Sequence, residues 1–318
     1  MFENKQESVT DKIYAYSSGL QKSIRRGLVE DSLFYANRMI TEFPKNSNAV
    51  LKKLLTCLTE DIGFANPPLA FELYHFLKHE NRKAWAIRNN AQLELVAKFA
   101  LSTKSREIDN CICSCTLFDY QEDSAFIREY EKDHFKLNSE SFKRSISSLN
   151  PELFNFLWLP ASRVERSYLD SLYQEYNEEI ESRLEEFGKN MPGEYSHIYS
   201  TLALETKNFG DGLILLYYTF FYLFSKYETE LLPFFTEPEE PIKINIESYD
   251  YKKDRVIPDY VYDKHTSQWR RLWRGFIHFF TEGAKLTNKV LILNQKYENI
   301  IFSPEGKLKL LKIDKKGL

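Results

Sequence analysis

Apolar residues recur at helical spacing through the first third of the chain. Leu20 and Ile24 lie four residues apart, and two further apolar series occupy residues 33–40 and 50–58. This spacing gathers apolar side chains on one face of an α-helix. Gly27 separates the first two series and favours a turn there. The pattern therefore predicts three helices joined by short loops, which would pack helix against helix.

The residues at the ends of these segments fit that prediction. Asp31 and Ser32 suit the start of the second helix, where the partial positive charge of a helix end favours an acidic side chain. Gly63 is a typical stop for the third helix, and Asn66 with the two prolines after it predicts a turn. Further helices are predicted over residues 69–100.

The middle of the chain carries three other patterns. Residues 162–187 repeat an apolar position every four residues, opposite a glutamate-rich face, which predicts one long amphipathic helix with a solvated acidic side. Residues 193–235 predict two core helices, the second of them aromatic almost all round. The acidic, proline-rich stretch at 236–241 is typical of a linker.

Beyond that stretch, the pattern predicts a small β element. Isoleucines alternate with polar residues at 242–246, and short apolar runs follow at 289–293, 300–302 and 308–313, with a turn expected at 304–306. The predicted fold class is therefore mainly α, a multi-helix array with a small β element near the C-terminus.

Composition adds two constraints. Hydrophobic residues make up 43% of the 318 residues, and 24 Phe with 20 Tyr predict a core rich in aromatic rings. Glycine and proline are scarce at 11 each, which favours helices over tight turns. The net charge of −3 gives no general attraction to nucleic acid or anionic membrane, so any such contact requires a local basic patch.

Cysteine spacing and hydropathy argue against a zinc site and a membrane span. Cys111, Cys113 and Cys115 alternate, whereas paired zinc ligands usually have two to four residues between them. Buried free thiols in a reducing cytosol are the simpler interpretation, so no metal is predicted. The most apolar run, residues 213–224, is too short to cross a bilayer, and the N-terminus lacks a signal-peptide pattern. We therefore expect a soluble, cytoplasmic protein.

Three short blocks follow one another in the first third of the chain. They are Lys-Ser-Ile-Arg at 22–25, Leu-Phe-Tyr with Arg-Met-Ile within 33–40, and Thr-Glu-Asp-Ile-Gly-Phe-Ala-Asn-Pro at 59–67, with a fainter echo at 100–105. In order and spacing they resemble the C-terminal helical region of the replication-associated recombination protein A family (RarA, also MgsA). These are AAA+ ATPases related to clamp loaders. Arg26 departs from the family pattern, which usually has Gly there.

The resemblance implies a clamp-loader-collar-like helical region that holds subunits together. The residues that match the family blocks would then act as structural ion pairs or subunit contacts, and not as catalysts. They are Lys22, Arg25, Arg38, Glu60 and Asp61. The implied partners are further copies of the chain, as a homo-oligomer, or a separately encoded AAA+ ATPase or other replication protein, because the ATPase part expected before this region is absent from the sequence. Apolar faces such as residues 33–35 and 213–224 would form the contacts.

These observations predict three regions. Residues 1–115 would form the RarA-like helical oligomerisation domain, and residues 116–235 a further helical region packed on it. Residues 236–318 would hold a basic, aromatic helix with short strands. The function expected from the resemblance is that of a non-catalytic assembly protein in DNA replication or repair.

A second candidate site lies in the last of these regions. Basic residues crowd a short stretch in which two tryptophans are interleaved. They are Lys264, His265, Arg270, Arg271 and Arg274. Basic groups offer contacts to phosphates and indoles can stack on bases, so the alternative function is a DNA-binding module, with DNA as the partner. The same stretch also fits a helix over 267–286 with an aromatic inner face and arginines in water, and the two interpretations are compatible.

No motif predicts an enzyme. The chain has neither the glycine-rich loop with Lys and Ser or Thr that cradles a triphosphate, nor a G-x-S-x-G nucleophile turn. We therefore predict no catalytic residues and no cofactor. A further alternative is a nuclease or transferase that uses Asp263 and His265.

Overall fold

The computed structural model describes a helical array at the start of the chain and several segments near its end. The described residues are 9–44, 48–63, 65–78, 90–106, 109, 198–199, 201–203, 214–215, 244–263, 266, 272, 274–287, 299 and 301–316. They are mainly helical, and none of them forms a β-strand. The predicted mainly-α class is therefore confirmed.

The first two helices form a hairpin. Helix α1 (Val9–Arg26) is followed after two residues by α2 (Val29–Glu42). Gly27 has a φ of 72°, in the left-handed region that ends many helices, and its N–H donates to the Ile24 carbonyl at 3.0 Å. Asp31 lies in the first turn of α2. The turn and the acidic helix start are as predicted.

The hairpin is packed closely because α1 carries a glycine at the crossing. A Cβ placed on Gly19 would lie 2.5 Å from the Tyr35 ring of α2, far inside van der Waals contact. Tyr35 is buried, and its ring also contacts those of Phe34 and Tyr16. The aromatic core expected from composition therefore begins between these two helices.

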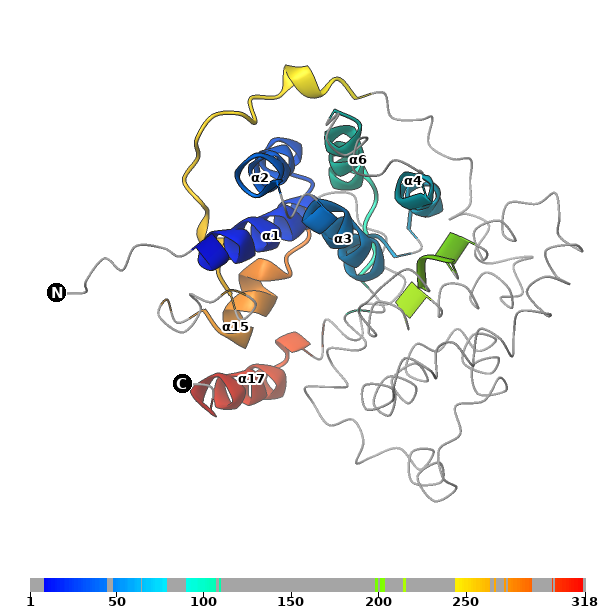
Figure 1. Cartoon of the computed structure of the whole chain (residues 1–318). Helices are drawn as coiled ribbons and strands as arrows, with labels where there is room; N and C mark the ends of the chain where they lie inside the picture. The colour runs from blue at the N-terminus through cyan, green and yellow to red at the C-terminus, as the bar shows by residue number, and fades with distance from the viewer. Residues whose placement is uncertain are drawn as a thin grey trace, which may run out of the picture.

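Three more helices complete the array. After α3 (Asn48–Cys57) the chain widens into the π-helical turn η2 (Leu58–Ile62), and α4 (Pro67–Lys78) and α6 (Asn90–Leu101) follow. Figure 1 shows α2, α3 and α6 gathered around α1, with α4 beyond α3. Their apolar faces meet in one core, whose fully buried members include Leu20, Ile24, Leu33, Leu54, Leu58, Leu73 and Val96.

A strap from the far end of the sequence crosses the outside of this array. Residues 244–263 (yellow in Figure 1) run past α6, α2 and α1 and contain two short 3-10 turns, η5 (Ile246–Ser248) and η6 (Asp259–Val261). Tyr251 is buried in the same core as the array. Arg255 of the strap pairs with Asp31 of α2 at 2.7 Å. The strap therefore covers α1 and α2 with side chains of the same chain.

The C-terminal segments form a second, smaller cluster. Helix α15 (Phe276–His278) continues into the π-helical turn η7 (Phe279–Gly283), and α17 (Pro304–Lys316) packs against α15. The α17 residue Asp314 accepts the N–H of Phe276 at 2.6 Å and that of Ile277 at 3.2 Å. A carboxylate from one helix therefore caps the start of the other.

The predicted β element is wrong wherever the structure describes it. Residues 246–248 form a 3-10 turn, residues 301–302 are helical, and residues 304–313 lie inside α17. The alternation of lysine and leucine at 307–310 resembles a strand pattern, but the helix start outweighs it. Ser303 accepts the Gly306 N–H at 2.9 Å, as an N-cap residue does, and proline at the first helical position is already preset for a helix.

Two other expectations change. The helix predicted over 267–286 is interrupted at residues 274–275, where a Cβ on Gly275 would lie 2.2 Å from an Asp314 oxygen. The apolar face at 33–35, expected to contact other subunits, is buried within the chain, partly beneath the strap. The predicted helix at 162–187, linker at 236–241 and strand at 289–293 lie outside the described residues.

Candidate functional site

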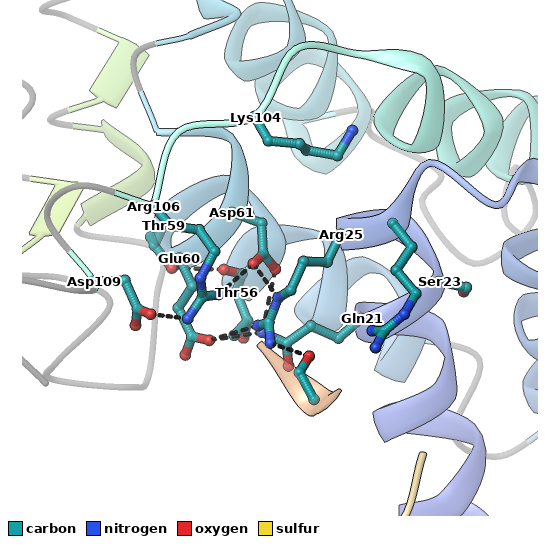
Figure 2. A network of polar contacts seen from close by, with 12 residues as sticks. Gln21, Ser23, Arg25, Thr56, Thr59, Glu60, Asp61, Lys104, Arg106 and Asp109 are labelled. Atoms are coloured by element: carbon teal, nitrogen blue, oxygen red, sulfur yellow. Dashed lines mark hydrogen bonds and ion pairs between the residues drawn. The ribbon is translucent and has the colours of Figure 1, made fainter. Parts of the chain in front are cut away.

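A buried carboxylate shared by two arginines forms the centre of the site. Arg25 Nε of α1 and Arg106 Nη1, which follows α6, each donate to Asp61 Oδ1 at 2.6 Å. Asp61 is 0% exposed and the two arginine side chains 1% and 2%. Figure 2 shows both guanidinium groups converging on this carboxylate. Three segments that are separate in sequence are tied at one point.

The wide turn η2 positions Asp61. The Gly63 N–H donates to the Leu58 carbonyl at 2.7 Å, which closes the π-helical turn, and Gly63 then leaves with a φ of 56°. Single π turns within α-helices are rare and occur frequently at functional sites. The Asp61 carbonyl also accepts the Ser105 N–H at 2.8 Å. Glycine at residue 63 was predicted as a helix stop, but the π geometry before it was not.

The two arginines stabilise the ionised form of Asp61. Burial disfavours the carboxylate, but the charges and hydrogen bonds of Arg25 and Arg106 outweigh burial and hold the pKa of Asp61 below its usual value. Glu60, its neighbour, behaves in the opposite way. Desolvation, together with the carboxylates of Asp109 and Asp61, raises the pKa of Glu60. Asp61 is therefore a fixed anion, whereas Glu60 binds a proton more readily.

Glu60 lies at the edge of the centre, with 31% of its side chain exposed. Gln21 Nε2 of α1 donates to Glu60 Oε2 at 2.6 Å, and Arg25 Nη2 lies 3.7 Å from the same oxygen. Lys53 Nζ donates to the Gln21 side-chain oxygen at 3.1 Å. The polar network therefore runs outward from Asp61 to solvent along one side of α1.

Lys22, one turn before Arg25, forms a second buried pair. Its Nζ lies 2.6 Å from Asp263 Oδ2 and donates to the Val261 carbonyl at 2.7 Å. Burial lowers the pKa of Lys22 from 10.5 to about 8, although the negative charge of Asp263 opposes that shift. The strap is therefore fixed to α1 by a charge pair that solvent scarcely reaches.

Carbonyl groups of η7 accept hydrogen bonds from two further donors of this basic turn. Arg25 Nη1 donates to the Gly283 carbonyl at 2.8 Å, and Arg26 Nη2 donates to the Glu282 carbonyl. The Arg26 guanidinium also lies 4.1 Å from the centre of the Tyr260 ring, in cation–π contact. The last turn of α1 thus holds both η6 and η7 in place.

The echo at 100–105 joins the site through a helix cap. Lys104 Nζ donates to the carbonyls of Phe99 and Ala100 at 2.9 Å each and to that of Ser102 at 2.5 Å. Phe99 and Ala100 lie in the last turn of α6, whose carbonyls have no partners within the helix. The buried ammonium of Lys104 therefore fixes the turn that delivers Arg106 to Asp61. Sequence reasoning missed Arg106, and nothing in its local pattern marks it.

The other predicted residues lie apart from this centre or beyond the described part of the chain. Arg38 pairs with Glu42 at 3.1 Å and with Asp254 of the strap, next to the Phe34 ring. Arg274 Nε donates to Asp259 at 3.0 Å. The remaining basic candidates fall outside the described residues. They are Lys264, His265, Arg270 and Arg271.

Asp263 and Cys57, two groups with reactive side chains, are both buried in the described part of the chain. Asp263, which a nuclease or transferase would use together with His265, is 0% exposed and pairs with Lys22. Within these ranges no three His, Cys, Asp or Glu side chains are grouped closely enough to hold a metal ion. Cys57 is a buried free thiol whose pKa is raised by burial. None of the described helices has the length and apolar character needed to span a bilayer.

Comparisons with known proteins provide no family assignment. No protein-family model matches the chain, and no curated protein or solved structure matches it significantly.

Proposed function

We propose that this chain is a non-catalytic assembly protein of DNA replication or repair, whose helical array works like the oligomerisation region of a RarA-type ATPase. One observation carries the proposal. Residues chosen only because they match separate family blocks, Arg25 in the first and Asp61 in the third, form a direct ion pair of 2.6 Å. Residues that form one interaction have a physical reason to occur together in a sequence, which supports the resemblance.

The state of the network favours a structural role over catalysis. A general base needs a free lone pair and a pKa near the working pH. Asp61 lacks such a pKa, because Arg25 and Arg106 hold it below its usual value, and the side chain is 0% exposed. Asp263 is likewise held by Lys22. The described carboxylates at the site therefore fix helices to one another, as a scaffold for assembly requires.

While the strap lies on its own chain, contacts between subunits must use surfaces other than residues 33–35, one of the two apolar faces that the sequence suggested. Leu33 and Tyr35 are 0% and 2% exposed. In that arrangement an assembly role depends on residues that remain exposed after the strap has covered the helical hairpin.

The test is the size of the full chain in solution, measured by sedimentation velocity over a wide range of protein concentration. The same measurement is made with a purified RarA-type ATPase, and an unrelated protein of similar net charge is the control. We expect association that increases with concentration, or a complex with the ATPase but not with the control. A monomer at every concentration that binds neither protein would contradict the proposal.

A further inference from the structure

The strap is anchored on the helical array at its two ends. Ile246 and Tyr251 at one end and Val261 at the other are at most 3% exposed and belong to the core of the array. Residues 252–260, between these anchors, are all exposed or half-buried. The strap therefore lies on the array as a bound peptide would, with its middle held from one side.

The middle of the strap meets complementary charges on α2. Arg255 donates to Asp31 Oδ1 at 2.7 Å and lies 3.1 Å from Glu30 Oε2. One residue earlier the charges are reversed, because Asp254 of the strap pairs with Arg38 of α2. Two ion pairs of opposite sense allow the strap only one register on α2.

An aromatic ring lies beneath both arginines of this contact. The Arg255 and Arg38 guanidinium carbons are 5.9 and 5.3 Å from the centre of the Phe34 ring, whose residue is 4% exposed. The face of an aromatic ring attracts a guanidinium group. We call Glu30, Asp31 and Phe34 the α2 site, which binds an arginine presented on an irregular segment.

These contacts are made by side chains and do not depend on how the chain connects them. Residues 107–243 separate the helical array from the strap in the sequence. Arg274 and His278 both contact Asp259 of η6, so the C-terminal cluster is attached to the strap. A second copy offers the same strap and the same α2 site. Exchange of an identical element between two chains repeats contacts that already exist, which makes it a low-cost route to a dimer.

We propose that the strap of one copy occupies the α2 site of a second copy, so that two copies exchange their straps. This inference rests on the proposed assembly function and names the surface that assembly uses. Phe34, from the face that the sequence assigned to subunit contacts, is then covered by another subunit. The exchange is reciprocal, so it closes as a two-fold pair with both α2 sites filled. Each strap also competes for its own α2 site, so exchange increases with protein concentration.

The experiment mixes two full-length variants whose charges at this contact are exchanged. Arg255→Glu places a like charge opposite Glu30 and Asp31, and the α2-site variant, Glu30→Lys with Asp31→Lys, places one opposite Arg255. Each strap is then repelled by its own α2 site and meets an opposite charge only on the other variant. Sedimentation velocity should show a one-to-one complex. Its dissociation constant should be at least about tenfold below that for self-association of either variant alone.

Lys253→Glu is the matched control for Arg255→Glu. Lys253 lies on the same strap, its side chain is 78% exposed, and it pairs with Asp250 of the strap itself. It receives the same change of charge, but its mixture with the α2-site variant should give no complex. Far-ultraviolet circular dichroism verifies that each variant keeps its helices.

A second measurement keeps the charges of the contact and decides the matter if a charge variant loses its helices. Arg255→Lys retains the positive charge and supplies an amine that a carbodiimide couples to a carboxylate of the α2 site. Chains with normal and with heavy nitrogen are mixed at a concentration where the chain assembles and left to equilibrate. Mass spectrometry should then find cross-linked peptides in which the strap and the α2 site carry different isotopes.

The outcomes separate the exchange from the assembly function. Charge variants that keep their helices but stay apart when mixed, or cross-links confined to one isotope, would overturn the exchange and leave assembly standing. A control mixture that forms the complex equally well would also overturn it, because charge anywhere on the strap would then suffice. A wild type that is monomeric at every concentration overturns the inference, and the proposed function falls with it only if the ATPase complex is also absent.

Discussion

Lys22 and Asp263 form an ion pair of 2.6 Å that joins the first helix to a strap near the other end of the chain. Both side chains are almost completely buried, at 4% and 0% exposure. Pairs of this kind cost desolvation energy on both sides, and breaking one leaves an uncompensated charge in the core. One of the contacts that hold the strap on α1 therefore depends on the charge of Lys22.

The stability of the fold should rise between pH 8 and pH 10.5 because of Lys22. Its pKa is about 8 in the folded chain and 10.5 as the ordinary value. Below pH 8 the group is charged in both states and the folded state bears the cost of burying it. Above pH 10.5 it is neutral in both and that cost is gone. The gain is about 3 kcal/mol at ~1.4 kcal/mol per pKa unit.

The measurement is urea unfolding of the wild type and of Lys22→Met across this pH range. Subtracting the two curves removes the titration of other lysines and tyrosines, which both proteins share. The wild type should gain stability relative to Lys22→Met as the pH rises. Parallel curves would show that Lys22 keeps its ordinary pKa in the fold.

Replacing the shared carboxylate should be the most damaging single change in the site. Asp61→Asn leaves Arg25 and Arg106 buried side by side without an anion between them. Removing one partner of a buried pair costs about 3–5 kcal/mol. Asp109→Asn is the comparison, because Arg106 also donates to Asp109 but keeps Asp61 when Asp109 is replaced, so the loss of stability should be smaller. Equal midpoints of chemical unfolding for the two variants would refute the central role of Asp61.

Gly19→Ala should destabilise the hairpin, although helix propensity predicts the reverse. Alanine stabilises a helix interior over glycine by about 1 kcal/mol. Here the new Cβ would lie 2.5 Å from the Tyr35 ring. Overpacking of this kind costs about 1–3 kcal/mol. Thermal unfolding tests the sign, and the same substitution made in a Tyr35→Leu background should lose most of its cost. A higher melting temperature for Gly19→Ala would contradict the prediction, because it would mean that α1 and α2 move apart to accommodate the new Cβ at no net cost.

Local rules explain why the first four helices were predictable. Each signal used for them acts on residues close to it in the sequence: the apolar spacing, the glycines at residues 27 and 63 and the prolines after Asn66. The structure has its turns at these glycines, and α4 begins at the first of these prolines. The same rules failed at 308–313, where the capping serine and the proline before the run counted for more than its alternating pattern.

The sequence by itself determined the helical class, the turns that separate the early helices and the residues that could form ion pairs. Only the tertiary structure decided which of them do. Lys22 pairs with Asp263, and Arg25 and Arg106 both donate to Asp61. These partners are far apart in the sequence, so no local pattern predicts them. A charged side chain finds its partner through the packing of whole helices, because burial makes an unpaired charge too costly to keep.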